Sequence, residues 1–176
     1  MDIITKNEKS IFLLGFMGSG KSTVSKILAE KLGWKLIDMD ERIVAEQKMS
    51  INDIFAQYGE EHFRKLETSL LQRLVEGTPA VISCGGGLPL REKNRQIIKE
   101  NGLGVLLTAS PETIYKRLIG DDQRPLLKDS MTVEHIAEML ESRKAAYDEV
   151  AHIVVDTENK SPLEVCNEIL KAKKPL

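Results

Sequence analysis

The feature that most constrains this chain is a glycine-rich stretch between an apolar run and an amphipathic segment. Residues 15–22 read G-F-M-G-S-G-K-S and match the pattern G-x-x-x-x-G-K-[ST] at every fixed position. The preceding residues 11–14 (I-F-L-L) suit a strand that is buried on both faces, and residues 21–32 carry apolar side chains at helical spacing. The pattern predicts a strand, a loop and a helix in that order.

The chemistry of this loop suits a nucleoside triphosphate. Glycines let the backbone turn so that successive N–H groups face one anion, and a helix starting here adds its own unpaired N–H groups. Lys21 brings a positive charge to the outer phosphates, and the Ser22 hydroxyl is a hard oxygen ligand for Mg²⁺. The alternative is an ordinary glycine-rich turn. We expect nucleotide binding by Gly15, Gly18, Ser19, Gly20, Lys21, Ser22 and Thr23.

The overall composition favours one globular unit, which we expect to span residues 1–176. The formal net charge of −2 argues against general affinity for nucleic acid or an anionic membrane. No apolar run approaches the ~20 residues of a membrane span, and the first ten residues do not resemble a secretory signal. Cys84 and Cys166 could pair, but nothing in the sequence indicates a disulfide framework, and we interpret Cys84 as a buried small residue. We therefore expect a cytoplasmic protein without nucleic-acid or membrane partners.

Strand and helix patterns alternate along the chain, which predicts an α/β fold with a five-stranded parallel sheet flanked by helices in three layers. The further strands are expected at residues 34–37, 80–84, 104–108 and 152–155. Helices are expected at 21–32, 41–48, 50–76 with an interruption near Gly59, 90–100, 110–120, 132–149 and from 161 onward. Residues 121–130 are polar and predict a mobile loop.

Three of these strands end in chemically distinctive residues. Residues 15–22 follow the first strand, residues 38–40 (D-M-D) the second, and residues 85–87 (G-G-G) the third. Because ligands gather at the carboxyl ends of parallel strands, we expect the three segments to face one crevice.

The remaining motifs narrow the class of phosphate chemistry. The chain has no D-x-x-G, and its nearest approach to N-K-x-D lacks the aspartate, so a GTP switch is not indicated. The third strand ends in S-C-G-G-G where a motor ATPase would carry an acidic pair. These features favour a small kinase with one acceptor molecule.

From residue 11 to residue 170 the chain resembles the shikimate kinase family, a P-loop group similar to nucleoside monophosphate kinases. The resemblance rests on G-x-x-G-x-G-K-S (15–22), D-x-D (38–40), G-E-x-x-F-R-x-x-E (59–67), S-x-G-G-G (83–87), R-P-L-L (124–127) and R-x-x-x-Y (143–147). It implies a P-loop kinase fold with an acceptor-binding segment at 34–65 and a mobile lid at 120–131. It also implies transfer of the γ-phosphate of ATP to the 3-hydroxyl of shikimate, with Mg²⁺ as cofactor and a monomeric state.

The resemblance also implies residue roles. Asp38 would reach Mg²⁺ through water, and Ser22 would contact the metal directly. Arg117 and Pro162 would hold adenine, and Arg124 in the lid would reach the transferring phosphate. Catalysis would involve Asp40, Lys21 and Arg124. The acceptor would be bound by Asp40, Arg64, Gly85, Gly86, Gly87 and Arg143, with both arginines clamping its carboxylate.

The residue types alone leave alternatives open. Asp38 and Asp40, two apart at a strand end, would point in opposite directions, or could be solvated acids or a helix cap. Arginines on amphipathic helices usually face water, and three glycines can form a plain flexible loop. At the level of function, Arg64 and Arg143 could suit any carboxylated polyol, so another small-molecule kinase, such as one for gluconate, is an alternative. A nucleotide-binding regulator without catalysis is the further alternative.

Overall fold

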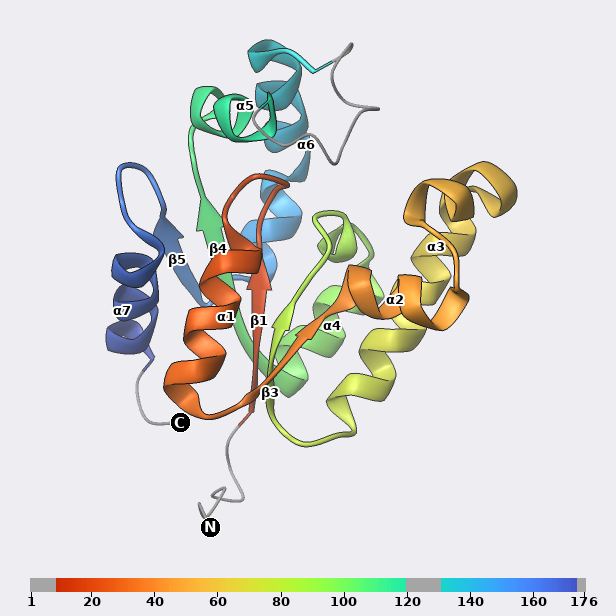
Figure 1. The fold of residues 1–176 in the computed structure, drawn as a ribbon, viewed down its shortest axis with the longest axis horizontal. Coiled ribbons are helices and arrows are strands. Elements are labelled where there is room, and N and C mark those ends of the chain that lie inside the picture. The colour runs from red at the N-terminus through yellow and green to blue at the C-terminus, as the bar shows by residue number, and fades with distance from the viewer. Residues whose placement is uncertain (1–8, 120–130, 174–176) are drawn as a thin grey trace.

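Five parallel strands form the centre of the part of the chain that the computed structural model describes, residues 9–119 and 131–173. They follow one another in space as β2-β3-β1-β4-β5, so β1 with its glycine-rich loop lies in the middle (Figure 1). The strands are β1 (Ser10–Leu14), β2 (Lys35–Asp38), β3 (Ala80–Ser83), β4 (Gly102–Thr108) and β5 (Ile153–Asp156). The α/β fold with a five-stranded parallel sheet is confirmed.

Helices cover both faces of this sheet. α1 (Lys21–Leu32) and α7 (Pro162–Ala172) pack on one face, and α3 (Ile51–Val75), α4 (Glu92–Asn101) and α6 (Val133–Val150) lie toward the other (Figure 1). The remaining elements are α2 (Met39–Gln47), α5 (Pro111–Ile119) and the short 3₁₀ helix η1 (Leu88–Leu90).

The apolar run of β1 shows why the sheet is buried on both faces. Ile11 and Leu13 join the cluster beneath α1 and α7, while Phe12 and Leu14 join the cluster beneath α3 and α4. Successive side chains in a strand point to opposite faces, so a strand covered on both faces needs a continuous apolar run rather than an alternating one.

The local helix signals form as expected. Gly33 ends α1 in the left-handed conformation, with φ 65°. The Ser50 hydroxyl accepts a hydrogen bond from the Asp53 amide at the start of α3, and Ser161 forms a capping box with Glu164 at the start of α7. Gly59 lies inside α3 with φ 80°, which kinks the helix at the predicted interruption.

Some boundaries differ from those expected. α2 begins at Met39 rather than at residue 41, because the Asp38 carboxylate accepts a hydrogen bond from the Glu41 amide (3.1 Å) and caps the helix. The helix-cap alternative for Asp38 is therefore confirmed, and Asp40 lies in the first turn of α2. The expectation that strand alternation points the two side chains in opposite directions does not apply, because Asp40 is helical and residues two apart on a strand would share a face. β4 begins at Gly102, directly after α4. The predicted loop at 121–130 and lid at 120–131 lie outside the described residues, except for Met131.

Within residues 9–119 and 131–173, no helix is long and apolar enough to cross a membrane. Cys84 and Cys166 are both buried free thiols. Burial raises the pKa of the Cys84 thiol, so it stays protonated and packs as a small apolar residue.

Leu71 on α3 provides a test of this packing. Leu71→Ala removes a fully buried side chain from the cluster beneath α3 and should lower the free energy of unfolding by about 2–5 kcal/mol. Leu163→Ala, at a side chain that is 49% exposed, is the matched control and should change it far less. Urea unfolding of both variants measures the difference, and equal effects would contradict the assigned packing.

Candidate functional site

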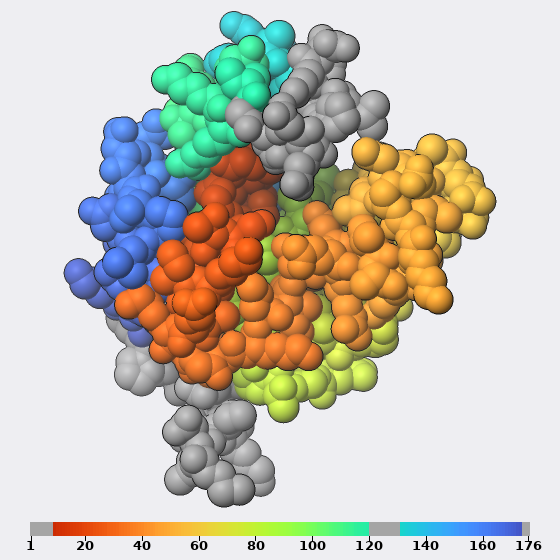
Figure 2. Space-filling view, in the orientation of Figure 1, coloured from red at the N-terminus to blue at the C-terminus, as the bar shows by residue number. Residues whose placement is uncertain are grey.

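The three distinctive strand ends meet at one edge of the sheet, as expected. The loop after β1, the start of α2 after β2 and the glycines after β3 all lie at the carboxyl ends of parallel strands (Figure 1). Figure 2 shows that the surface is hollowed between this loop and the segment formed by α2 and α3. The hollow is the candidate active site.

The phosphate-binding loop has a backbone that only glycine can adopt comfortably at its first position. Gly15 has φ 146°, and a Cβ atom there would lie 2.6 Å from both the Leu107 carbonyl oxygen and Ser19 Oγ. Lys21 Nζ bends back over the loop and donates to the carbonyl oxygens of Gly15 (2.7 Å) and Phe16 (3.0 Å). The ammonium group is thus held at the mouth of the loop, where an anion would bind.

Gly85 and Gly87 lie at positions where a side chain would collide with neighbouring side chains. A Cβ atom on Gly85 would lie 2.8 Å from Glu67 Oε1 and 3.0 Å from Asp40 Oδ1. A Cβ atom on Gly87 would lie 2.5 Å from both terminal nitrogens of Arg64. The structure therefore brings Asp40 and Arg64, which belong to α2 and α3, against the same backbone segment.

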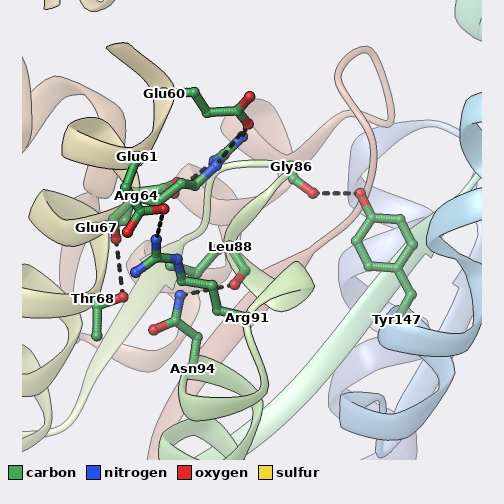
Figure 3. A network of polar contacts seen from close by, with 10 residues as sticks. All are labelled: Glu60, Glu61, Arg64, Glu67, Thr68, Gly86, Leu88, Arg91, Asn94 and Tyr147. Atoms are coloured by element: carbon green, nitrogen blue, oxygen red, sulfur yellow. Dashed lines mark hydrogen bonds and ion pairs between the residues drawn. The ribbon is translucent and has the colours of Figure 1, made fainter. Parts of the chain in front are cut away.

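Gly86 connects this segment to the phosphate-binding loop and to α6. A Cβ atom on Gly86 would lie 3.5 Å from the Gly15 carbonyl oxygen and 3.6 Å from Arg143 Nη1. The Tyr147 hydroxyl donates to the Gly86 carbonyl oxygen (2.7 Å; Figure 3), and Arg143 Cζ lies 5.2 Å from the centroid of the Phe16 ring. Arg143 therefore lies between the loop that suits phosphate and the glycines.

Arg64 is held by two glutamates on its own helix. Nη1 donates to Glu67 Oε2 (2.6 Å), and Nη2 donates to Glu60 Oε1 (3.0 Å), as Figure 3 shows. The side chain of Glu67 is 1% exposed and that of Glu60 is 64% exposed. Glu67 therefore acts as the buried anchor of the Arg64 guanidinium, and Glu60 as its exposed partner.

Burial dominates the electrostatics of Glu67. Removal from water raises the pKa of its carboxyl group, and the charge of Asp40 raises it further, while Arg64 opposes both effects. Burial also tends to lower the pKa of Arg64, but Glu67 and Glu60 reverse this, so the guanidinium stays charged. Sequence reasoning gave Glu67 no role. Its presence in the 59–67 motif was the available signal, whereas its burial depends on the packing of α3.

Arg117 lies at the other side of the phosphate-binding loop. Its Nη1 donates to the Gly18 carbonyl oxygen (3.0 Å) and to Thr157 Oγ1 (3.1 Å). Pro162, the first residue of α7, follows the same turn after β5 that carries Thr157. The structure thus brings Arg117 to the loop, whereas Arg124 lies outside the described residues.

The oxygen donors expected for a metal come from two elements. Ser22 is in the first turn of α1, and Asp38 ends β2, two strands away from β1. Among the described residues, no three His, Cys, Asp or Glu side chains cluster as a metal site.

This fold, with a glycine-rich phosphate loop after the central strand and an acceptor-side hollow beside it, defines a P-loop kinase, an ATP-dependent phosphotransferase. Residues 17–174 match the family model described as shikimate kinase. The chain is 46% identical over 162 residues to the shikimate kinase of Persephonella marina, with 92% of this chain and 97% of that protein covered. It therefore belongs to the shikimate kinase family.

Solved structures agree with this family. The shikimate kinase from Acinetobacter baumannii in complex with shikimate superposes with a TM-score of 0.88 at 33% identity, covering 94% of this chain and 93% of that one. A gluconokinase from Sinorhizobium meliloti reaches a TM-score of 0.62 at 23% identity, covering 96% of this chain and 93% of that one. This second likeness shows the shared fold alone, so the gluconate kinase alternative is not favoured.

The raised pKa of Glu67 predicts a pH dependence of stability. Because the folded chain keeps this proton to higher pH than the unfolded chain, the stability contributed by Glu67 is full below the ordinary pKa of 4.5 and is lost as pH rises through the raised value. The difference in the free energy of unfolding between the parent chain and Glu67→Gln should therefore shrink as the pH rises. Urea unfolding between about pH 4 and 8 measures this difference.

Glu61 supplies the control for this experiment. It pairs with Arg91 on the surface (2.5 Å; Figure 3), and the hydrogen bond from Arg91 lowers its pKa. The stability that Glu61 contributes is present above its ordinary pKa. The loss in the free energy of unfolding caused by Glu61→Gln should therefore be constant across the upper part of this pH range. A flat response for Glu67→Gln as well would contradict the buried carboxylate described here.

Proposed function

We propose that this chain transfers the γ-phosphate of ATP to the 3-hydroxyl of shikimate, giving shikimate 3-phosphate and ADP. The observation that carries the proposal is the meeting of Asp40, Arg64 and Arg143 at the glycine segment 85–87, directly beside the phosphate-binding loop. Membership of the shikimate kinase family and the bound shikimate of the Acinetobacter structure support this acceptor.

The acceptor carboxylate binds between Arg64 and Arg143 in this proposal. A guanidinium group pairs with a carboxylate through two parallel hydrogen bonds and keeps its charge. Because Glu67 is buried and Glu60 is exposed, the acceptor carboxylate replaces Glu60 on Arg64 while Glu67 keeps the guanidinium in place. The backbone of Gly85, Gly86 and Gly87 then lies within reach of the ring hydroxyls.

The reaction is an in-line displacement at the γ-phosphorus. The 3-hydroxyl oxygen forms the new P–O bond, the bond from the γ-phosphorus to the bridging oxygen of ADP breaks, and Asp40 aligns the hydroxyl and receives its proton. Lys21 turns from its backbone partners to the phosphates, and Arg124 joins it in balancing the developing charge. Positioning and charge stabilisation supply most of the catalysis in phosphoryl transfer.

The residues present fit a magnesium ion as cofactor. Ser22 would supply a hydroxyl oxygen to the ion, and Asp38 would contact it through water. Bound Mg²⁺ neutralises charge on the outer phosphates of ATP. The Asp38 carboxylate also caps α2, so it has a structural role besides.

Arg117 and Pro162 hold the adenine ring, the segment 120–131 forms a lid over ATP, and residues 34–65 form the acceptor-binding segment. The enzyme acts as a cytoplasmic monomer on small molecules and needs no nucleic acid or membrane. Two free buried cysteines suit a reducing compartment.

Release of ADP, measured by a coupled assay with different acceptors, tests the function. Shikimate should support turnover, whereas gluconate and a nucleoside monophosphate should not. Preferred turnover with gluconate would replace the acceptor in this proposal. No turnover with any acceptor, together with intact ATP binding, would favour the non-catalytic regulator.

Asp40→Asn tests the acceptor-side acid. The variant keeps the size of the side chain but removes the charge that receives the proton, so kcat should fall by about 10²–10⁴-fold. Affinity for an ATP analogue should stay nearly unchanged, because Asp40 lies against Gly85 rather than in the phosphate-binding loop. Glu41→Gln, at the next residue of α2, is the control and should keep turnover. Full turnover of Asp40→Asn would remove Asp40 from catalysis.

Arg143→Ala tests the carboxylate clamp. Loss of a hydrogen bond to a charged group costs about 1.5–3 kcal/mol, so the KM for shikimate should rise roughly 10–100-fold. Arg73→Ala, at an exposed arginine that pairs with Glu46, is the control and should leave both KM values unchanged. Steady-state kinetics with each substrate varied makes the comparison, and a defect confined to ATP would show that the assignment is wrong.

A further inference from the structure

A second cavity lies behind the phosphate-binding loop, and none of the residues assigned to the acceptor lines it. It has a volume of about 360 Å³ and lies between this loop, β4, α5 and α6. Its walls are mainly apolar and include Phe16, Leu106, Ile114 and Leu140. Of the residues assigned above to ATP, metal or acceptor binding, only Ser19 lines it.

Ser19 is a buried polar residue in the wall of this cavity, and its hydroxyl favours a ligand with a polar atom. Its side chain is buried, with 1% of the residue exposed, and its Oγ has no hydrogen-bond partner in the part of the chain that the structure describes. A buried hydroxyl left without a partner is unfavourable, so native structures rarely keep one without a reason. A ligand hydroxyl bound in the cavity would satisfy it.

The mouth of the cavity carries a net negative charge. Glu141, Lys144 and Asp148, all exposed on α6, line this side. Lys144 Nζ donates to the Asp148 carboxylate, so its positive charge is already matched, and Glu141 adds a second carboxylate nearby. Charge complementarity at the mouth therefore favours a cationic group over an anionic one.

The volume limits the size of the occupant. An apolar cavity of about 150 Å³ holds one benzene molecule, so this cavity has room for one aromatic ring with a short side chain. We propose that it is a second small-molecule site, which binds a hydroxylated aromatic ring whose side chain ends in an ammonium group. The ring hydroxyl pairs with Ser19, and the ammonium group lies beside Glu141.

We expect a ligand bound in this cavity to change the affinity for the acceptor. Phe16 and Tyr147 both line the cavity, and both also contact groups assigned to the acceptor. The face of the Phe16 ring lies against Arg143, and the Tyr147 hydroxyl donates a hydrogen bond to the Gly86 carbonyl oxygen. A ligand packed against them therefore changes the affinity for the acceptor, and the acceptor changes the affinity for the ligand by the same factor. This coupling rests on the proposed function, whereas the site itself does not.

Calorimetric titration of the full chain with three probes tests the site. Tyramine carries both the phenol and the ammonium group, phenethylamine lacks the phenol hydroxyl, and 3-(4-hydroxyphenyl)propionate carries a carboxylate in place of the ammonium group. Tyramine should bind at least several-fold more tightly than either analogue. Absence of tyramine binding at millimolar concentration, or equal or tighter binding of the carboxylate probe, would overturn the proposal.

Variants on α6 locate the binding. Ala137→Trp fills the cavity from its exposed mouth and should abolish tyramine binding, whereas Ala145→Trp, at an exposed alanine of the same helix outside the cavity, should leave it intact. Glu141→Gln should weaken the binding of tyramine but not that of 3-(4-hydroxyphenyl)propionate, which has no ammonium group. Tyramine binding that survives Ala137→Trp would place the ligand elsewhere. The coupling is read separately from the KM for shikimate at saturating tyramine, and an unchanged KM would overturn the coupling alone.

Discussion

The candidate site depends on a stretch of backbone that has no side chains. Gly85, Gly86 and Gly87 lie where the ends of three neighbouring strands meet, and a single Cβ atom on either outer glycine would collide with Asp40, Glu67 or Arg64. Because the segment is bare, the phosphate-binding loop and the helices α2, α3 and α6 all reach the same hollow. In the reaction proposed above, a bulkier segment would separate the nucleotide from the acceptor, and in-line transfer requires the two to be in contact.

Because the glycine segment has no side chains, charged groups lie close together there. The two carboxylates that pair with Arg64 differ in how deeply they are buried. Glu67 is buried with one partner, Arg64, whose other partner, Glu60, is exposed. An arginine held by one buried carboxylate keeps a fixed direction, while the exposed carboxylate can give way to a ligand. The same principle applies at Lys21, which rests on backbone carbonyl oxygens that a phosphate can replace. Arg64 and Lys21 are thus held in place by partners that an anionic ligand can replace.

Residue patterns were sufficient for the parts of the fold that depend on neighbours in the chain. Gly33, Gly59, Ser50 and Ser161 stop, kink or start helices where expected, since capping and backbone preferences act over a few residues. The errors lie at boundaries. α2 starts at Met39 because Asp38 serves as its cap, which apolar periodicity does not signal, so Asp40 belongs to the helix rather than to the strand.

The sequence by itself determined the strand–loop–helix unit around Lys21, the alternation of strands and helices, and the residue types available for phosphate and carboxylate chemistry, because these are properties of short segments. Only the tertiary structure decided which charged groups meet. Arg64 and Arg143 lie far apart in the chain, and each came to the glycine segment through the packing of α3 and α6 against the sheet. The burial of Glu67, and the cavity behind Ser19, likewise exist only because separate elements pack together, and burial sets the free energy of a charge or an unpaired hydroxyl.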